Sequence, residues 1–154
     1  MALKVTKVDV WAVEFRDEPG GLAKALAPIA AAGGNLECII ARRQADKFQA
    51  GLAFLTPLKG KKVVAAATAA GFAPAEELTT LRVEGPDTPG SCSRMVSAIA
   101  DAGINMRGVS SMSAGRNFVA YVGLDSLADA ATVTKILKKF GASKGATKRK
   151  LVRA

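Results

Sequence analysis

The chain has 154 residues, of which 49% are apolar, and a net charge of +9. This length fits one domain of ordinary size or two small ones, and the apolar fraction is typical of a globular protein rather than a disordered one. No apolar run reaches the roughly 18 residues of a membrane span, and the first residues lack the apolar region of a secretory signal. We therefore expect a cytoplasmic protein that does not enter the membrane.

The positive charge is concentrated near the C-terminus. Residues 138–154 carry seven basic side chains and no acid, which leaves a charge of +2 for the rest of the chain (9 − 7 = 2). Such a run is more often a solvated end than a nucleic-acid arm. We expect no nucleic-acid binding beyond a weak, nonspecific level, including at the cluster Lys148, Arg149 and Lys150.

Residue types that carry catalysis are scarce. The sequence has no histidine, which removes the commonest general base and the commonest metal ligand. The two cysteines, Cys38 and Cys92, do not form a C-x-x-C pair, and their apolar neighbours favour a place in the core. We therefore expect no enzyme, no metal site and no cofactor.

An internal repeat with an offset of 70 residues organises the chain. Asp17-Glu18-Pro19-Gly20 returns as Asp87-Thr88-Pro89-Gly90 (87 − 17 = 70). Gly33-Gly34-Asn35-Leu36 returns as Gly103-Ile104-Asn105-Met106 at the same offset. A repeat of this kind indicates two copies of one structural unit.

Both copies predict the same order of elements: strand, helix, strand, strand, helix. This order, with room for a last strand, is typical of an α+β ferredoxin-like unit with two helices on one face of an antiparallel sheet. In copy one we expect strands at 8–16, 36–43 and 48–55 and helices at 20–32 and 59–70. In copy two we expect strands at 76–84, 106–113 and 118–124, a helix after Gly90 and a helix at 127–140.

The connection between the copies has room for one long strand and not for two. That strand ends one sheet and begins the next, or else residues 3–6 or the C-terminal segment supply a missing edge. The sequence leaves these alternatives open. We place the first unit at 1–75 and the second, with the basic C-terminal segment, at 76–154.

The repeated Asp-x-Pro-Gly motif predicts a helix start. Proline suits the first helical position, Asp17 and Asp87 can cap free amides, and Gly20 and Gly90 allow a tight turn. A helix N-terminus with free N–H groups suits a carboxylate or phosphate. A plain strand-to-helix turn is the alternative interpretation.

Asp-x-Pro-Gly, an apolar helix and then Gly-x-Asn before a strand together resemble the ACT domain, a small regulatory module that binds ligands. The resemblance covers both copies and is closest to stand-alone proteins of two tandem ACT domains. It implies βαββαβ units that associate, often as a homodimer. It also implies a regulatory function with an amino acid as ligand and a regulated enzyme or regulator as partner. A protein with the same fold but degenerate, non-binding sites is the alternative.

The resemblance places the ligand between the first strand–helix loop of one domain and the second strand of its neighbour. Backbone amides after the loop glycines would hold the ligand carboxylate, and asparagine side chains would hold its polar atoms. Both asparagines also suit a left-handed turn. The candidate residues are Asp17, Glu18, Gly20, Gly21, Leu22, Asn35 and Leu36 in copy one, and Asp87, Thr88, Gly90, Ser91, Cys92, Asn105 and Met106 in copy two.

The two loops differ in charge, and we expect the Asp87 loop to be the better site. In copy one Asp17 and Glu18 place two acids near the expected ligand carboxylate. In copy two Thr88 and Ser91 replace Glu18 and Gly21, so two hydroxyls replace a repelling charge. A hydrogen bond to a charged group contributes roughly 1.5 to 3 kcal/mol.

Overall fold

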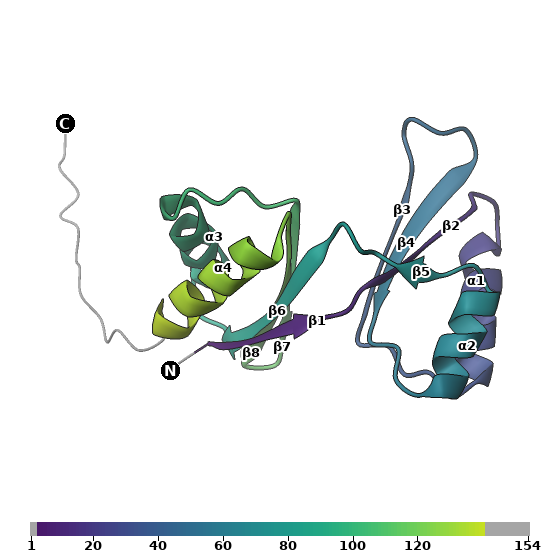
Figure 1. Cartoon of the computed structure of the whole chain (residues 1–154), viewed down its shortest axis with the longest axis horizontal. Coiled ribbons are helices and arrows are strands. Elements are labelled where there is room, and N and C mark those ends of the chain that lie inside the picture. Colours follow the sequence, from purple (N-terminus) through teal and green to yellow (C-terminus); the bar gives the residue numbers. More distant parts are fainter. Residues whose placement is uncertain (1–2, 141–154) are drawn as a thin grey trace. The chain divides into compact units, whose positions relative to one another are not determined.

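The computed structural model describes residues 3–140, which form two compact units (Figure 1). The first unit comprises residues 7–80, and the second comprises residues up to 6 together with those from 81 onward. This division differs from the expected boundary after residue 75 mainly because the N-terminal segment belongs to the second unit. The basic cluster at 148–150 lies outside the described residues.

The first unit has the expected order of elements. Its sheet runs β3-β4-β2-β5, in which β2 is antiparallel to β4 and β5, and β3 is antiparallel to β4. Two helices cover one face of this sheet (Figure 1). The elements are β2 (Trp11–Arg16), α1 (Gly21–Ala31), β3 (Cys38–Arg43), β4 (Ala50–Thr56), α2 (Lys61–Ala69) and β5 (Ala73–Pro74).

The second unit repeats this order but takes its outer strand from the N-terminus. Its sheet runs β1-β6-β8-β7, so β1 stands where β5 stands in the first unit. This confirms the ferredoxin-like α+β class and decides between the alternatives for the missing edge. The elements are β1 (Lys4–Val8), β6 (Thr79–Pro86), α3 (Ser91–Asp101), β7 (Gly108–Ala114), β8 (Asn117–Leu124) and α4 (Leu127–Phe140).

Each unit has its own hydrophobic core between sheet and helices. The predicted strand face of the first unit is confirmed, because Val13 is buried and Trp11 and Phe15 pack against the same cluster. In the second unit Val5 of β1 is only 6% exposed and belongs to the core with Leu81, Val83, Met95 and Ile99. The N-terminal strand therefore contributes apolar contacts as well as backbone pairing.

The two repeated helices begin within a residue of the expected positions, at Gly21 and Ser91, but proline does not occupy the first helical position. The N-cap residues are Gly20 and Gly90, and neither helix has a side-chain cap, so the predicted capping by Asp17 and Asp87 is wrong. Proline and glycine instead occupy the centre of a turn: the amide of Ser91 donates to the carbonyl oxygen of Thr88 at 3.0 Å, and Gly90 has φ 80°. This is the type II turn, which favours proline and then a left-handed glycine.

The last helix begins as its sequence predicts. Ser126 Oγ accepts a hydrogen bond from the amide of Asp129 at 3.0 Å and donates to the Asp129 carboxylate at 2.8 Å. This pairing satisfies one of the free amides of the first turn. Among the described residues, no helix is long and apolar enough to cross a membrane.

Candidate functional site

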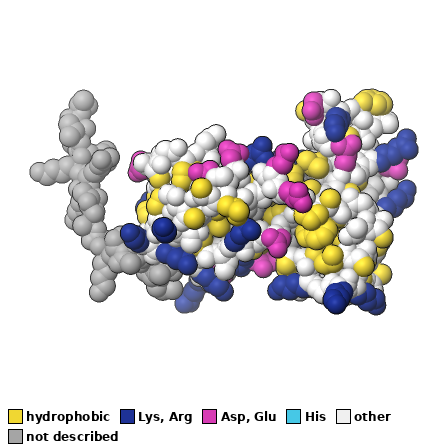
Figure 2. Space-filling model, viewed as in Figure 1, with side chains coloured by type: hydrophobic (Ala, Val, Ile, Leu, Met, Phe, Trp, Pro, Cys, Tyr) yellow, Lys and Arg dark blue, Asp and Glu magenta, His cyan; other side chains and the backbone are white. Residues whose placement is uncertain are grey.

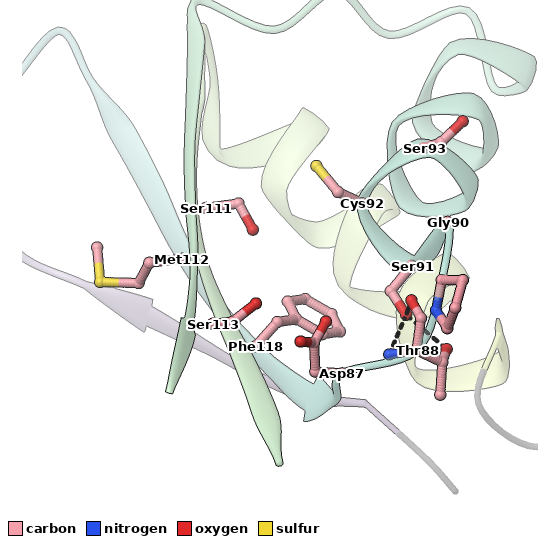
Figure 3. Close-up of a pocket in the computed structure, with 11 residues that line it drawn as sticks. Asp87, Thr88, Gly90, Ser91, Cys92, Ser93, Ser111, Met112, Ser113 and Phe118 are labelled. Atoms are coloured by element: carbon pink, nitrogen blue, oxygen red, sulfur yellow. Dashed lines mark hydrogen bonds between the residues drawn. The ribbon is translucent and has the colours of Figure 1, made fainter. Parts of the chain in front are cut away.

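The second unit contains a cavity of about 410 Å³ beside the start of α3 (Figure 3). One wall is the loop between β6 and α3 with the first turn of α3, and the other wall is β7. Phe118 of β8 lies between them (Figure 3). The lining residues are Asp87, Thr88, Pro89, Gly90, Ser91, Cys92, Ser93, Ser111, Met112, Ser113 and Phe118.

The α3 side of the cavity offers hydrogen-bond donors. No side chain caps the helix, and the amides of Cys92 and Ser93 have no hydrogen-bond partner among residues 3–140. Free amides in the first turn and the helix dipole together favour a negatively charged group. This end of the cavity therefore suits a carboxylate.

The opposite wall of the cavity is polar and neutral. Ser111 and Ser113 of β7 direct their hydroxyls toward α3, whereas Met112 points to the other side of the strand (Figure 3). Alternation of this kind follows from the two-residue period of a strand. Sequence reasoning missed these serines, although their place on one strand face was readable from the alternation.

Asp87 supplies a negative charge to the same cavity. Its carboxylate is exposed and has no ion-pair or hydrogen-bond partner within the described part of the chain. The carboxylate lies near Phe118 and Ser113 (Figure 3). The cavity therefore combines a free carboxylate with the positive end of a helix.

The two loop hydroxyls are already engaged, which corrects the expectation that they donate to a ligand. Ser91 Oγ donates to the carbonyl oxygen of Thr88 at 2.8 Å, and the two hydroxyl oxygens lie 2.8 Å apart. The guanidinium of Arg94 donates to Thr88 Oγ1 at 2.9 Å and to the carbonyl oxygen of Pro89 at 2.8 Å. These hydroxyls shape the loop, and sequence reasoning missed Arg94.

The corresponding region of the first unit contains charged pairs. Arg43, at the position of Ser113, forms an ion pair with Asp17. Glu18 is paired with Arg16 at 3.3 Å and with Lys24 at 3.6 Å. The prediction that the two loops are unequal therefore remains, but its reason changes: the acids of the first loop are neutralised, and an arginine occupies the place of a small hydroxyl.

Aromatic packing also differs between the units at the residue two positions before the loop aspartate, which is Phe15 in the first unit and Gly85 in the second. In the first unit the ring of Phe15 lies against Gly51 and Gly21, and Phe48 is 92% exposed in a turn that precedes β4. In the second unit the side chains of Leu3 and Phe118 fill the place beside Gly85, and Phe118 is 4% exposed. The return strand expected at 48–55 therefore begins at Ala50.

The Gly-x-Asn segments do not reach these loops within their own units. Asn35 and Leu36 precede β3, and Asn105 and Met106 precede β7, so none of them lies in the strand where it was expected. Each segment follows the C-terminal end of an 11-residue helix, about 16 Å from the loop at its start. Leu36 and Met106 pack against the cores.

The two asparagines do not adopt the left-handed conformation. Positive φ angles occur instead at Gly33, with 86°, and at Gly103, with 73°. Asn35 and Asn105 are exposed. A left-handed backbone conformation therefore does not account for asparagine at these two positions.

The two cysteines have different surroundings. Cys38 is buried, and burial raises the pKa of its thiol. Cys92 is exposed on α3 and lines the cavity, so its predicted place in the core is wrong. Cys92 lies in the first turn of α3 and faces the cavity between α3 and β7, which its neighbours in sequence do not reveal.

We expect one thiol of the folded protein to react rapidly with a thiol reagent. Cys92 should react because it is accessible, whereas Cys38 should react only after unfolding. Titration with a chromogenic disulfide in buffer and in denaturant should give one fast thiol and then two. Cys92→Ser should remove the fast reaction, and rapid reaction of this variant would contradict the assignment.

Comparison with known proteins identifies the architecture. No family model and no curated protein matches the chain. Protein BT0572 from Bacteroides thetaiotaomicron is similar in structure, with a TM-score of 0.72 and 14% identity over 85% of this chain and 88% of that one. The ligand-free regulatory subunit of aspartate kinase from Thermus thermophilus has a TM-score of 0.63 and 13% identity, over 94% and 98% of the two chains.

Both units have the ACT-type fold. The regulatory subunit of aspartate kinase from Thermus flavus is also similar, with a TM-score of 0.54, 15% identity and coverage of 88% of this chain and 97% of that one. Two of these three neighbours are named as regulatory subunits of aspartate kinase. Identities of this size establish the shared fold of the ACT-type units and leave their ligand and partner to be tested.

Proposed function

We propose that this ACT-type protein is a regulatory module that binds a free amino acid in the cavity of its second unit. One observation carries the proposal: the same cavity is lined by a carboxylate and by the free backbone amides of a helix N-terminus. The unpaired carboxylate of Asp87 suits the ligand ammonium, and the free amides of Cys92 and Ser93 suit its carboxylate.

The remaining walls support a small polar ligand. Cavities of roughly 300 to 1,000 Å³ are typical of small-molecule sites, and about 410 Å³ lies at the lower end of that range. Ser111 and Ser113 offer hydroxyls to the ligand side chain (Figure 3). Asn35, Leu36, Asn105 and Met106 would contribute only from another unit or another copy of the chain.

The proposed partners are a second copy of the chain and an enzyme or regulator that responds to the bound amino acid. The regulatory aspartate kinase subunits among the structural neighbours support a regulated partner. We propose a cytoplasmic location and a non-catalytic role. Figure 2 shows both basic and acidic side chains on the face that it presents, and nucleic acid is not among the proposed partners.

A thermal-shift panel of the twenty amino acids tests the proposal. A ligand at a hundredfold excess over its dissociation constant adds about 2.7 kcal/mol of stability. For this length the midpoint should rise by roughly 5 to 11 °C. We expect Asp87→Asn to weaken the best amino acid about tenfold or more, because the ligand ammonium loses its charged partner.

Asp101→Asn is the matched control, since Asp101 is an exposed acid at the other end of α3. It should leave the affinity unchanged. The ligand should also slow the reaction of Cys92 with a thiol reagent. If no amino acid shifts the midpoint or protects Cys92, the proposal is wrong, and a non-binding protein with degenerate sites becomes the better interpretation.

A further inference from the structure

Arg94 holds the cavity loop together from outside. It lies in α3, is exposed and is not among the residues that line the cavity. Its guanidinium reaches back over the first turn to Pro89, Thr88 and Ser91, with a third donor–acceptor distance of 3.3 Å to Ser91 Oγ. One side chain thus forms hydrogen bonds to three residues at the start of α3.

The loop depends on this link because its backbone is tightly turned. Gly90 has φ 80°, and a Cβ there would lie 2.9 Å from Arg94 Nη1. The carbonyl oxygen of Pro89 accepts a hydrogen bond from Arg94 Nη1 at 2.8 Å. A planar guanidinium with several fixed donors is suited to bridging such acceptors, and a lysine is not.

The first unit shows what the same position does without this link. Lys24 occupies the position of Arg94 and pairs with Glu18 at 3.6 Å, with both side chains substantially exposed. Such exposed pairs contribute little to stability. The backbone amide of Lys24 donates to the carbonyl oxygen of Gly20 at 2.9 Å, as that of Arg94 does to Gly90, but within residues 3–140 the Lys24 ammonium makes no hydrogen bond to Pro19 or Gly20. The loop that lines the cavity is therefore the one to which an arginine side chain is hydrogen-bonded.

We propose that Arg94 is a positioning residue, which sets the loop from Asp87 to Gly90 in its ligand-binding shape without touching the ligand. This inference rests on the proposed function. When a loop becomes ordered only on binding, this ordering offsets part of the binding free energy, whereas a loop that is already ordered carries no such cost. Arg94 would thus raise the affinity by ordering the loop in the ligand-free protein.

The experiment compares Arg94→Ala and Arg94→Lys with the unchanged protein, using the amino acid that gives the largest thermal shift. Calorimetry measures the dissociation constant, and NMR measures amide hydrogen exchange in the ligand-free state. The amides of Thr88 and Ser91 report on the loop, since both are bonded inside it at 3.2 Å and 3.0 Å. Lys24→Ala is the matched control in the first unit.

We expect Arg94→Ala to accelerate exchange of both amides and to raise the dissociation constant about tenfold, which corresponds to about 1.4 kcal/mol. Arg94→Lys should recover part of both effects, because an ammonium can bond fewer of the three acceptors. Lys24→Ala should change neither quantity. The slow exchange of core amides such as those of β8 should persist in every variant.

Two outcomes overturn the inference in distinguishable ways. If Arg94→Ala accelerates exchange but leaves the dissociation constant unchanged, the arginine only stabilises the loop, and the proposed function stands. If the unchanged protein binds none of the amino acids, the proposed function fails and the positioning role fails with it.

Discussion

Val5→Asp should unfold most of the second unit and leave the first unit folded. Val5 is 6% exposed in the core that β1 shares with β6 and the two helices. Burial of a valine side chain contributes roughly 1.5 to 3 kcal/mol, and a carboxylate in an apolar site adds a further penalty. We expect a loss of at least about 3 kcal/mol, a large fraction of the stability of a small domain.

Chemical denaturation combined with amide exchange resolved by residue measures this effect in each unit. Thr6→Asp is the control, because Thr6 is the next residue on β1 and is exposed. It should change the free energy of unfolding by no more than about 0.5 kcal/mol. Equal effects of the two variants would show that β1 is not a core strand. Loss of amide protection in β4 as well would show that β1 does not stabilise the second unit alone.

Ser113→Arg should abolish amino-acid binding without unfolding the protein. Arg43 occupies the matching position in the first unit and pairs with Asp17, so the fold accommodates an arginine there. An arginine at 113 would fill the cavity and pair with Asp87, the group proposed to hold the ligand ammonium. We expect the dissociation constant to rise at least a hundredfold, or about 2.8 kcal/mol.

Calorimetry with the best amino acid measures the change, and the thermal midpoint without ligand checks the fold. Met112→Arg is the control, since Met112 precedes Ser113 on β7, its side chain points away from α3 and the first unit has Arg42 there. It should retain most of the affinity. Undiminished binding by Ser113→Arg would place the ligand elsewhere.

Local signals in the sequence determined most of the fold. The gap-free repeat and its alternating or helical apolar spacing depend only on neighbours along the chain, so the helices and the order of strands were readable. The capping pair Ser126 and Asp129 was readable for the same reason. The helix starts near Gly20 and Gly90 were readable too, but the role of the proline was not, because proline followed by glycine suits a type II turn as well as a first helical turn.

The sequence also singled out a loop that lines the cavity, since Asp87, Thr88, Gly90, Ser91 and Cys92 are all among its lining residues. It could not show that Arg43 pairs with Asp17 in the first unit, because the two residues are distant in sequence. It could not show that Arg94 bonds the loop hydroxyls, because this depends on the turn geometry. It also could not show that Asn105 lies away from the Asp87 loop, because this separation depends on how α3 is placed in the folded unit.

The sequence by itself therefore determined two α+β units of one kind and favoured the second loop, since both follow from repeat spacing and residue type. Only the tertiary structure decided that the N-terminal strand completes the second sheet. Backbone hydrogen bonds of an edge strand carry no sequence signature, so several segments were equally suited to that place. Only the tertiary structure showed a cavity, because it lies between the loop at 87–91 and Ser111 and Ser113 of β7, which are distant from that loop along the chain.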